Sequence, residues 1–374
     1  MFVLASVVVD VPQFPSAEAQ RFHVIAHTPG IPYRDFAVEY PIGELVLIKT
    51  LGSSSLRVTR ALLAVAACGS DAIAYATLRR RRGLVVAFRY LLLGSPLLFF
   101  LYRRFDLLGI ALAVFGVTAV LRSRERSGGA ALGGAVLFKL WPAVLTPALV
   151  IDRRLRAVRT TLLVVGSGFV GWMAFGGVGG LSQVAGFRGA SGWELESSVG
   201  AVVWAVTGRH RFEQGANRTG FMPVWSRIVL GLLLLLLLAA VWRKARRTSA
   251  DLAGAPALAA VASLLVLSTV LSPQYITWLL PWAAIASVGG RGRLWLVLAV
   301  APIVLTGALV AAWYLNVGLG PGGNQIVLMV RNATLIAIPV AWFVLEPRGI
   351  SLGRASTSAS LKEGSPPGAC NVAP

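Results

Sequence analysis

The stretch Ile228-Val-Leu-Gly-Leu-Leu-Leu-Leu-Leu-Leu-Leu-Ala-Ala-Val-Trp242 is followed directly by the basic cluster Arg243-Lys-Ala-Arg-Arg247. With the apolar residues just before it, this run approaches the roughly 20 residues that an α-helix needs to cross the hydrocarbon core of a bilayer. A cluster of positive charge after such a run is typical of the cytoplasmic end of a transmembrane helix. The segment therefore predicts a membrane-spanning helix and its direction.

Similar apolar runs recur along the whole chain of 374 residues, which is 56% hydrophobic and has a mean hydropathy of +0.73. A signal peptide or a single anchor cannot account for runs that are spread over the entire length. We predict an all-α polytopic membrane protein with about 9–11 membrane segments. The expected spans lie near residues 59–78, 84–102, 105–121, 160–178, 223–242, 253–271, 275–289, 294–314 and 325–344, with a special case at 129–150.

The formal net charge of +20 could indicate a nucleic-acid partner. The basic residues, however, gather after alternate spans, in clusters near residues 79–82, 122–126, 153–159, 243–247 and 291–293. Placing all of these clusters in the cytoplasm makes nearly every span alternate correctly. The charge is thus explained by orientation without nucleic acid, and we expect a multi-pass plasma-membrane protein with a cytoplasmic C-terminus and polar loops outside.

The segment 129–150 has basic clusters on both flanks, so both of its ends should be cytoplasmic. We interpret it as a re-entrant hairpin that turns near Lys139 and Pro142. Irregular backbone at membrane depth is tolerated where it is buried in protein or lines a wet cavity. A tilted full span with a misplaced basic flank is the alternative.

The two ends of the chain differ from the apolar middle. Residues 1–9 are apolar but too few to span a bilayer, although the loop that follows should be outside. We therefore expect that a first helix precedes Met1 in the natural protein or has been lost. The segment 347–374 is rich in Ser, Gly and Pro and predicts a disordered cytoplasmic tail, which leaves 1–346 as the transmembrane domain.

The first outer loop holds two carboxylates, Asp35 and Glu39, beside aromatic and proline residues at a membrane entry, and Asp10 lies upstream. A carboxylate held in apolar surroundings can take a proton from a hydroxyl, because burial raises its pKa. Aromatic rings suit the face of a sugar. The alternative is structural: Asp35 pairs with Arg34 or caps a helix near Glu39.

The run Tyr33-Arg-Asp-Phe-Ala-Val-Glu-Tyr-Pro41 resembles the first-loop signature of the GT-C superfamily, specifically the polyprenyl-phosphate-mannose-dependent alpha-mannosyltransferases of glycosyltransferase family 87. Further elements are similar to that family in the same order. They are Arg104-Phe-Asp106, the hairpin with Lys139 and Pro142, Trp193-Glu-Leu-Glu196-Ser197, and Ser272-Pro-Gln274-Tyr275. The resemblance covers roughly residues 10–282.

This resemblance implies a GT-C-type helical bundle that transfers a hexose, with mannose as the first choice, from a polyprenyl-phosphate donor to a lipid or glycan acceptor. Transfer would be an inverting single displacement at the extracytoplasmic face of a bacterial plasma membrane. We expect Asp35 to be the general base, followed by Asp10. Lys139, Arg104 and His210 are candidates for the donor phosphate. The candidates for the sugar or acceptor are Tyr33, Glu39, Tyr40, Glu196, Gln274 and Tyr275.

Each candidate also has a structural alternative. Lys139 and Arg104 could reach lipid headgroups, Glu196 and Gln274 could cap a helix or fasten a loop, and His210 could be solvated. Trp242 and Trp278, near the ends of spans, are most simply residues of the interfacial aromatic belt.

No motif demands a cofactor or a metal, since no Asp-x-Asp pair is present. A transporter or lipid flippase, a related enzyme with another prenyl-linked sugar, and a non-catalytic subunit are the competing functions. The absence of a convincing internal repeat and the gathering of carboxylates in outer loops disfavour the transporter.

Overall fold

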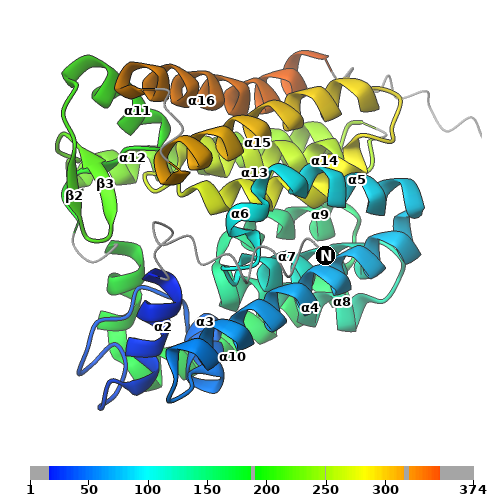
Figure 1. The fold of residues 1–374 in the computed structure, drawn as a ribbon. Coiled ribbons are helices and arrows are strands. Elements are labelled where there is room, and N and C mark those ends of the chain that lie inside the picture. The colour runs from blue at the N-terminus through cyan, green and yellow to red at the C-terminus, as the bar shows by residue number, and fades with distance from the viewer. Residues whose placement is uncertain (1–16, 187–189, 249, 316–319, 346–374) are drawn as a thin grey trace, which may run out of the picture.

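The computed structural model describes residues 17–186, 190–248, 250–315 and 320–345, and these form mostly helices (Figure 1). Their order is α2 (Ala17–His27), α3 (Ile42–Leu51), α4 (Leu56–Arg82), α5 (Leu84–Gly94), η1 (Ser95–Leu97), α6 (Leu98–Leu101), α7 (Asp106–Val120), α8 (Glu125–Lys139), η2 (Trp141–Leu145), α9 (Thr146–Ile151), α10 (Leu155–Gly186), β1 (Trp193–Glu194), α11 (Ser198–Thr207), β2 (Arg211–Glu213), β3 (Ala216–Thr219), α12 (Val224–Ala245), α13 (Ala255–Leu267), η4 (Pro273–Leu279), α14 (Leu280–Ala286), α15 (Gly292–Leu315) and α16 (Gly320–Leu345).

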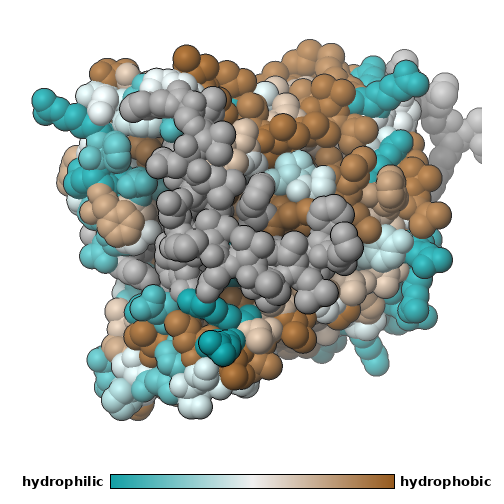
Figure 2. All heavy atoms as spheres, viewed as in Figure 1, coloured by the Kyte–Doolittle hydropathy of each residue, from teal (hydrophilic) through white to brown (hydrophobic). Residues whose placement is uncertain are grey.

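Within the described ranges, five helices are long and apolar enough to cross a membrane: α4, α10, α12, α15 and α16. Five shorter apolar helical segments accompany them in the described part of the chain. Much of the apolar surface remains exposed, and Leu235 and Leu236 of α12 are 64% and 68% accessible. Figure 2 shows such hydrophobic residues across the upper part of one face. A surface of this kind suits lipid contact, and the expected polytopic all-helical fold is confirmed.

The large loop between α10 and α12 contains a three-stranded antiparallel sheet in the order β1-β3-β2. Trp193 pairs with Thr219, and Phe212 pairs with Asn217. The strands are only two to four residues long, and the order of apolar and polar residues in the sequence did not predict them. The all-α prediction therefore holds for the bundle and needs this sheet as a correction.

The hairpin at 129–150 is confirmed by the way its two ends meet. Helix α8 runs from Glu125 to Lys139, after which Leu140 adopts a left-handed φ of 52° and η2 and α9 lead the chain back. Just after α9, the Arg154 side chain lies 3.2 Å from the Ser123 hydroxyl and 3.9 Å from the Glu125 carboxylate. The segment thus enters and leaves at the same end, and the alternative of a full span is wrong.

Glycines allow α8 to lie unusually close to α7 and α10. A Cβ atom on Gly128 would lie 2.8 Å from the Gly116 carbonyl oxygen of α7, and one on Gly129 would lie 2.4 Å from the Ala157 carbonyl oxygen of α10. Small residues at helix crossings are the usual way in which membrane helices pack. The glycines of the hairpin therefore serve packing.

The tryptophans that we assigned to the interfacial belt are inside the protein. Trp278 is 7% exposed and Trp242 is 3% exposed, and the Trp242 Nε1 donates to the Val144 carbonyl of the hairpin at 3.0 Å. The belt assignment was wrong for both residues, because their indole N–H groups find partners within the bundle.

We predict that Gly129→Ala destabilises the protein by about 1–3 kcal/mol, because the added methyl overpacks the contact with Ala157. Gly134→Ala on the same helix is the matched control, since a Cβ there meets nothing within 4 Å. Thermal unfolding in detergent measures both. An equal effect of the two variants would contradict the close packing of α8 on α10.

Candidate functional site

A cavity of about 370 Å³ opens between the first loop, the end of the hairpin, the large loop and the turn at 272–278. In Figure 1 the helices α2 and α3 lie below this region and the strands β2 and β3 lie above it. Most of the residues that the sequence singled out line the cavity. They are Glu39, Tyr40, Arg104, Lys139, Glu196, Gln274 and Tyr275.

Lys139, at the last position of α8, lies between two buried carboxylates. Its Nζ is 2.9 Å from Glu44 Oε1 and 3.7 Å from Asp106 Oδ2. The side chain of Glu44 is fully buried, and those of Asp106 and Lys139 are 2% and 9% exposed. Because charges withdrawn from water are stable only when they are compensated, this cluster ties α3, α7 and α8 together.

Three aromatic rings form one wall beside this cluster. The rings of Trp141 and Trp278 stack with centroids 5.2 Å apart, and those of Trp278 and Tyr275 stack at 4.3 Å. The Trp278 Nε1 donates to Asp106 Oδ1 at 2.8 Å. The stack thus links the hairpin turn to η4 and fixes one oxygen of Asp106. It also gives the cavity an aromatic part of its lining, which Tyr275 and Trp278 supply.

Carboxylates of the first loop are held by neighbouring groups. Arg21 of α2 donates to both oxygens of Glu39, at 3.1 Å and 2.8 Å. Asp35 accepts a hydrogen bond from the Ile31 amide at 2.6 Å, and Gly30 makes this turn possible, because its φ is 98° and a Cβ there would lie 2.7 Å from Asp35 Oδ2.

Three predicted residues are described but do not belong to the cavity lining. Asp35 lies in the turn that precedes it. Tyr33 is buried against Trp172 and donates its hydroxyl to the Tyr40 carbonyl at 2.6 Å, which makes it a support for the loop. His210 is exposed and packs against Trp204. Asp10 lies outside the described residues. The chemical roles proposed for these side chains stay predictions.

The cavity lining also includes the carboxylates of Glu194 and Glu196. Burial raises the pKa of Glu194 to about 7 and that of Glu196 to about 8, and the nearby Arg218 and Arg331 guanidinium groups lower them only in part. The Arg331 Nη2 lies 3.7 Å from Glu196 Oε2 and donates to the Glu196 carbonyl at 2.7 Å. Both carboxyl groups therefore have pKa values near neutral pH, which suits a group that takes up or releases a proton in catalysis.

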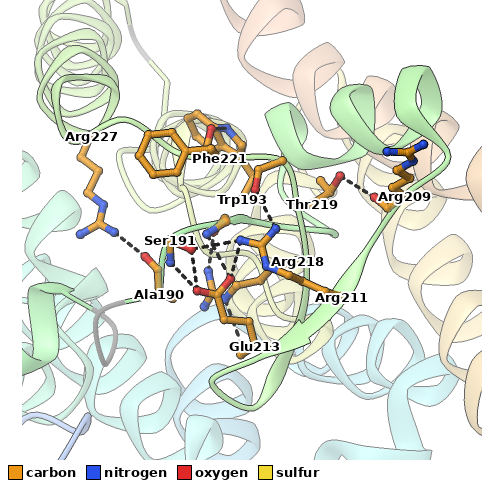
Figure 3. A network of polar contacts seen from close by, with 12 residues as sticks. Ala190, Ser191, Trp193, Arg209, Arg211, Glu213, Arg218, Thr219, Phe221 and Arg227 are labelled. Carbon is orange, nitrogen blue, oxygen red and sulfur yellow. Dashed lines mark hydrogen bonds and ion pairs between the residues drawn. The ribbon is translucent and has the colours of Figure 1, made fainter.

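The segment that carries these glutamates is anchored by a polar network in the large loop (Figure 3). Glu213 of β2 accepts from the Ser191 amide at 2.7 Å and the Ser191 hydroxyl at 2.8 Å, and Arg211 pairs with it at 2.9 Å. These bonds lower the pKa of Glu213 to about 2. Arg218 of β3 donates to the Gly192 carbonyl at 3.0 Å. Tertiary contacts, not a local helix, therefore position Glu194.

Sequence reasoning named neither Glu44 nor Glu194 as site residues, and it mentioned Asp106 only within the family resemblance. Glu44 sits in an apolar helix, and an ionisable residue among apolar neighbours is itself a functional signal that could have found it. Arg331, also buried completely within an apolar helix, reaches the cavity wall through Glu196. No group of three or more His, Cys, Asp or Glu side chains that could hold a metal ion occurs within the described ranges.

Fold and cavity together define a polytopic membrane protein whose bundle carries a polar, charged site at one end. Over residues 38–273, more than half of the chain, the sequence matches the family model of Glycosyltransferase family 87. The chain belongs to this family and is a membrane glycosyltransferase, consistent with the GT-C superfamily. No curated protein matches the chain.

We predict that Lys139→Met destabilises the protein by about 3–5 kcal/mol, because it leaves Glu44 and Asp106 buried without their cation. Glu44→Gln should cost less, since Asp106 remains as a partner for Lys139. The double variant Lys139→Met/Glu44→Gln should lose less stability than the sum of the losses in the two single variants. Lys49→Met, which removes an exposed lysine, is the control. Thermal unfolding measures all variants, and additive losses of stability for Lys139→Met and Glu44→Gln would argue against the ion cluster.

We predict that stability falls as the pH rises from about 4.5 to about 8. In this window the unfolded chain has released the protons of Glu194 and Glu196 while the folded protein still holds them, because their pKa values are raised from 4.5. Glu196→Gln should flatten the decline, and Glu125→Gln at the other end of the bundle should not. Thermal unfolding across this pH range is the measurement, and a rise in stability would contradict the burial of these carboxyls.

Proposed function

We propose that this glycosyltransferase moves a hexose, with mannose as the first candidate, from a polyprenyl-phosphate donor to a lipid or glycan acceptor. The observation that carries the proposal is the cavity in which the cations Lys139 and Arg104 face several carboxylates beside a stacked aromatic wall. A lipid-linked donor has to enter from the bilayer, and the family resemblance of the first-loop motif favours such a donor.

The chemistry needs three groups. An acceptor hydroxyl oxygen attacks the anomeric carbon while the bond from that carbon to the phosphate oxygen breaks, and the phosphate leaves with the electron pair. Lys139 and Arg104 would stabilise the charge that develops on the leaving phosphate. A carboxylate would take the proton of the hydroxyl, so that no covalent intermediate is needed.

Two positions compete for the role of base. The sequence resemblance favours Asp35, which lies four residues before the cavity-lining Glu39. The described geometry instead places Glu194 and Glu196 in the lining, with proton affinities near neutral pH. We retain Asp35 as the proposed base and include Glu196 in the same experiment, because the two positions give distinguishable outcomes.

The ends of the helices support the proposed orientation of the site. Helix α7 begins at Asp106, which contacts the cavity-lining Lys139, and ends next to the arginines at 122 and 124. Helix α12 begins beside the large loop and ends at the basic cluster 243–247. Lys244 also donates to the Trp342 carbonyl near the end of α16. The positive-inside rule then favours a cytoplasmic C-terminus and an extracytoplasmic cavity.

We predict that membranes containing the protein transfer label from radiolabelled polyprenyl-phosphate mannose to a lipid or glycan. Asp35→Asn should lower the rate at least about a hundredfold, which is the usual range for a general base. Lys139→Gln should also impair transfer, whereas the control Asp152→Asn, at the opposite end of the bundle, should leave it unchanged at matched expression.

Each other outcome carries its own meaning. Loss in Glu196→Gln with survival in Asp35→Asn would move the base to the large loop. Transfer from another prenyl-linked sugar but not from polyprenyl-phosphate mannose would show that the donor carries a sugar other than mannose. Loss of transfer on addition of EDTA would show that the reaction needs a divalent metal, which no motif in the sequence demands. Failure of every prenyl-phosphate sugar in folded wild type would argue against the donor class.

A further inference from the structure

A second and larger cavity, of about 600 Å³, lies at the end of the bundle opposite to the Lys139 site. It is formed between the last turns of α4 and the last turn of α7 with the residues that follow it. Its lining consists of Ile73, Ala76, Thr77, Arg80, Arg81, Phe115, Arg122 and Arg124. Of these described residues, half are arginines and none is a carboxylate, so the cavity is strongly cationic.

Two of the four arginines have structural partners within the protein. The Arg81 Nη1 donates to the Thr118 carbonyl at 3.2 Å, and its guanidinium lies 5.0 Å from the centre of the Phe115 ring. Arg122 donates to the Arg81 carbonyl. These contacts join the ends of α4 and α7 and hold both guanidinium groups at the cavity wall.

The other two arginines are exposed and make no side-chain hydrogen bond or ion pair to any part of the chain that the structure describes. These are Arg80 and Arg124. Nearby carboxylates are already engaged by other cations: Asp251 pairs with Arg82 at 2.5 Å, and Glu125 lies 3.9 Å from Arg154. Within the described part of the chain, no carboxylate therefore neutralises the positive charge of Arg80 and Arg124.

The apolar residues and the arginines of the lining lie at different depths in the bundle. Ile73 precedes Arg80 by seven residues on α4, whereas Phe115 lies within α7 and Arg122 in the turn just after the end of α7 at Val120. Residues seven apart lie on one face of a helix, about 10 Å apart along its axis. Both walls thus pass from an apolar residue within the bundle to an arginine at its end. Ile73 is 54% exposed, so the apolar part is open to the bilayer.

We propose that this cavity binds the headgroup of an anionic phospholipid, with the phosphate between Arg80 and Arg124 and an acyl chain along Ile73 and Phe115. Guanidinium groups recognise phosphate through paired hydrogen bonds, and basic pockets between membrane helices are suited to anionic headgroups. A free phosphate would leave the apolar depth unused. The positive-inside rule accounts for arginines at this end of the helices but not for their convergence on a cavity with an apolar floor.

The site is separate from the proposed transfer site, because it lies at the other end of α7 from Asp106. Occupation by a lipid would bridge α4 to α7 and to the segment that leads into the hairpin. It would therefore stabilise the scaffold on which Lys139 is mounted.

Native mass spectrometry of the detergent-purified protein tests the proposal with dioleoylphosphatidylglycerol, dioleoylphosphatidylcholine and free glycerol phosphate as probes. The double variant Arg80→Gln/Arg124→Gln removes the two unengaged arginines. Arg79→Gln/Arg126→Gln is the matched control, because it removes two exposed neighbouring charges that do not line the cavity. We expect the first phosphatidylglycerol to bind roughly tenfold more weakly to the cavity variant and with unchanged affinity to the control.

Three results would overturn the proposal. Equal weakening in both variants would show that general surface charge attracts the lipid. Equal binding of phosphatidylcholine by the wild type would remove the preference for an anionic headgroup, and equal binding of glycerol phosphate would make the ligand a free phosphate. If the cavity variant does not fold, a photoactivatable phosphatidylglycerol on wild type decides the matter: crosslinks at Ile73 or Phe115 support the site, and crosslinks confined elsewhere reject it.

Discussion

The architecture depends on one buried ion cluster, in which Lys139 lies between Glu44 and Asp106. Each charge comes from a different part of the chain: the hairpin, the helix α3 that follows the first loop, and the start of α7. Within an apolar bundle none of them is stable alone, since an isolated buried charge costs several kcal/mol. Their mutual compensation therefore forces the hairpin tip, the first loop and α7 to converge, and the cavity forms where they meet.

This convergence is accompanied by irregular backbone at the cavity and in the first loop beside it. Leu140 takes a left-handed φ at the end of α8, and Tyr33 does so in the first loop. Such backbone persists when surrounding contacts over-determine it. Here the stack of Trp141 on Trp278 and the hydrogen bond from Tyr33 to the Tyr40 carbonyl supply those contacts. The apolar helices provide the rigid frame, and the short irregular segments between them carry the polar groups.

The bundle consequently has two chemically different ends. One end gathers carboxylates with a few cations, and the large loop above it is held by the network around Glu213. The other end gathers arginines, of which some cap helix ends and others line a cavity. Both features follow from the membrane: an unpaired charge is costly in the middle of the bundle, where Arg331 is held by Glu196, so most of the charged groups lie at the helix ends and in the segments between them.

The sequence by itself determined the membrane class, the helix positions, the hairpin and the family, because apolar length, flanking arginines and ordered motifs are local properties. Local pattern also selected Lys139, Glu196 and Gln274, which line the cavity. Only the tertiary structure decided that Glu44 shares the charge of Lys139, that Trp278 is buried on Asp106 and that Asp35 lies in a turn before the cavity. These outcomes depend on which distant segments meet, and burial and pairing of charge are properties of that meeting and not of any one stretch of chain.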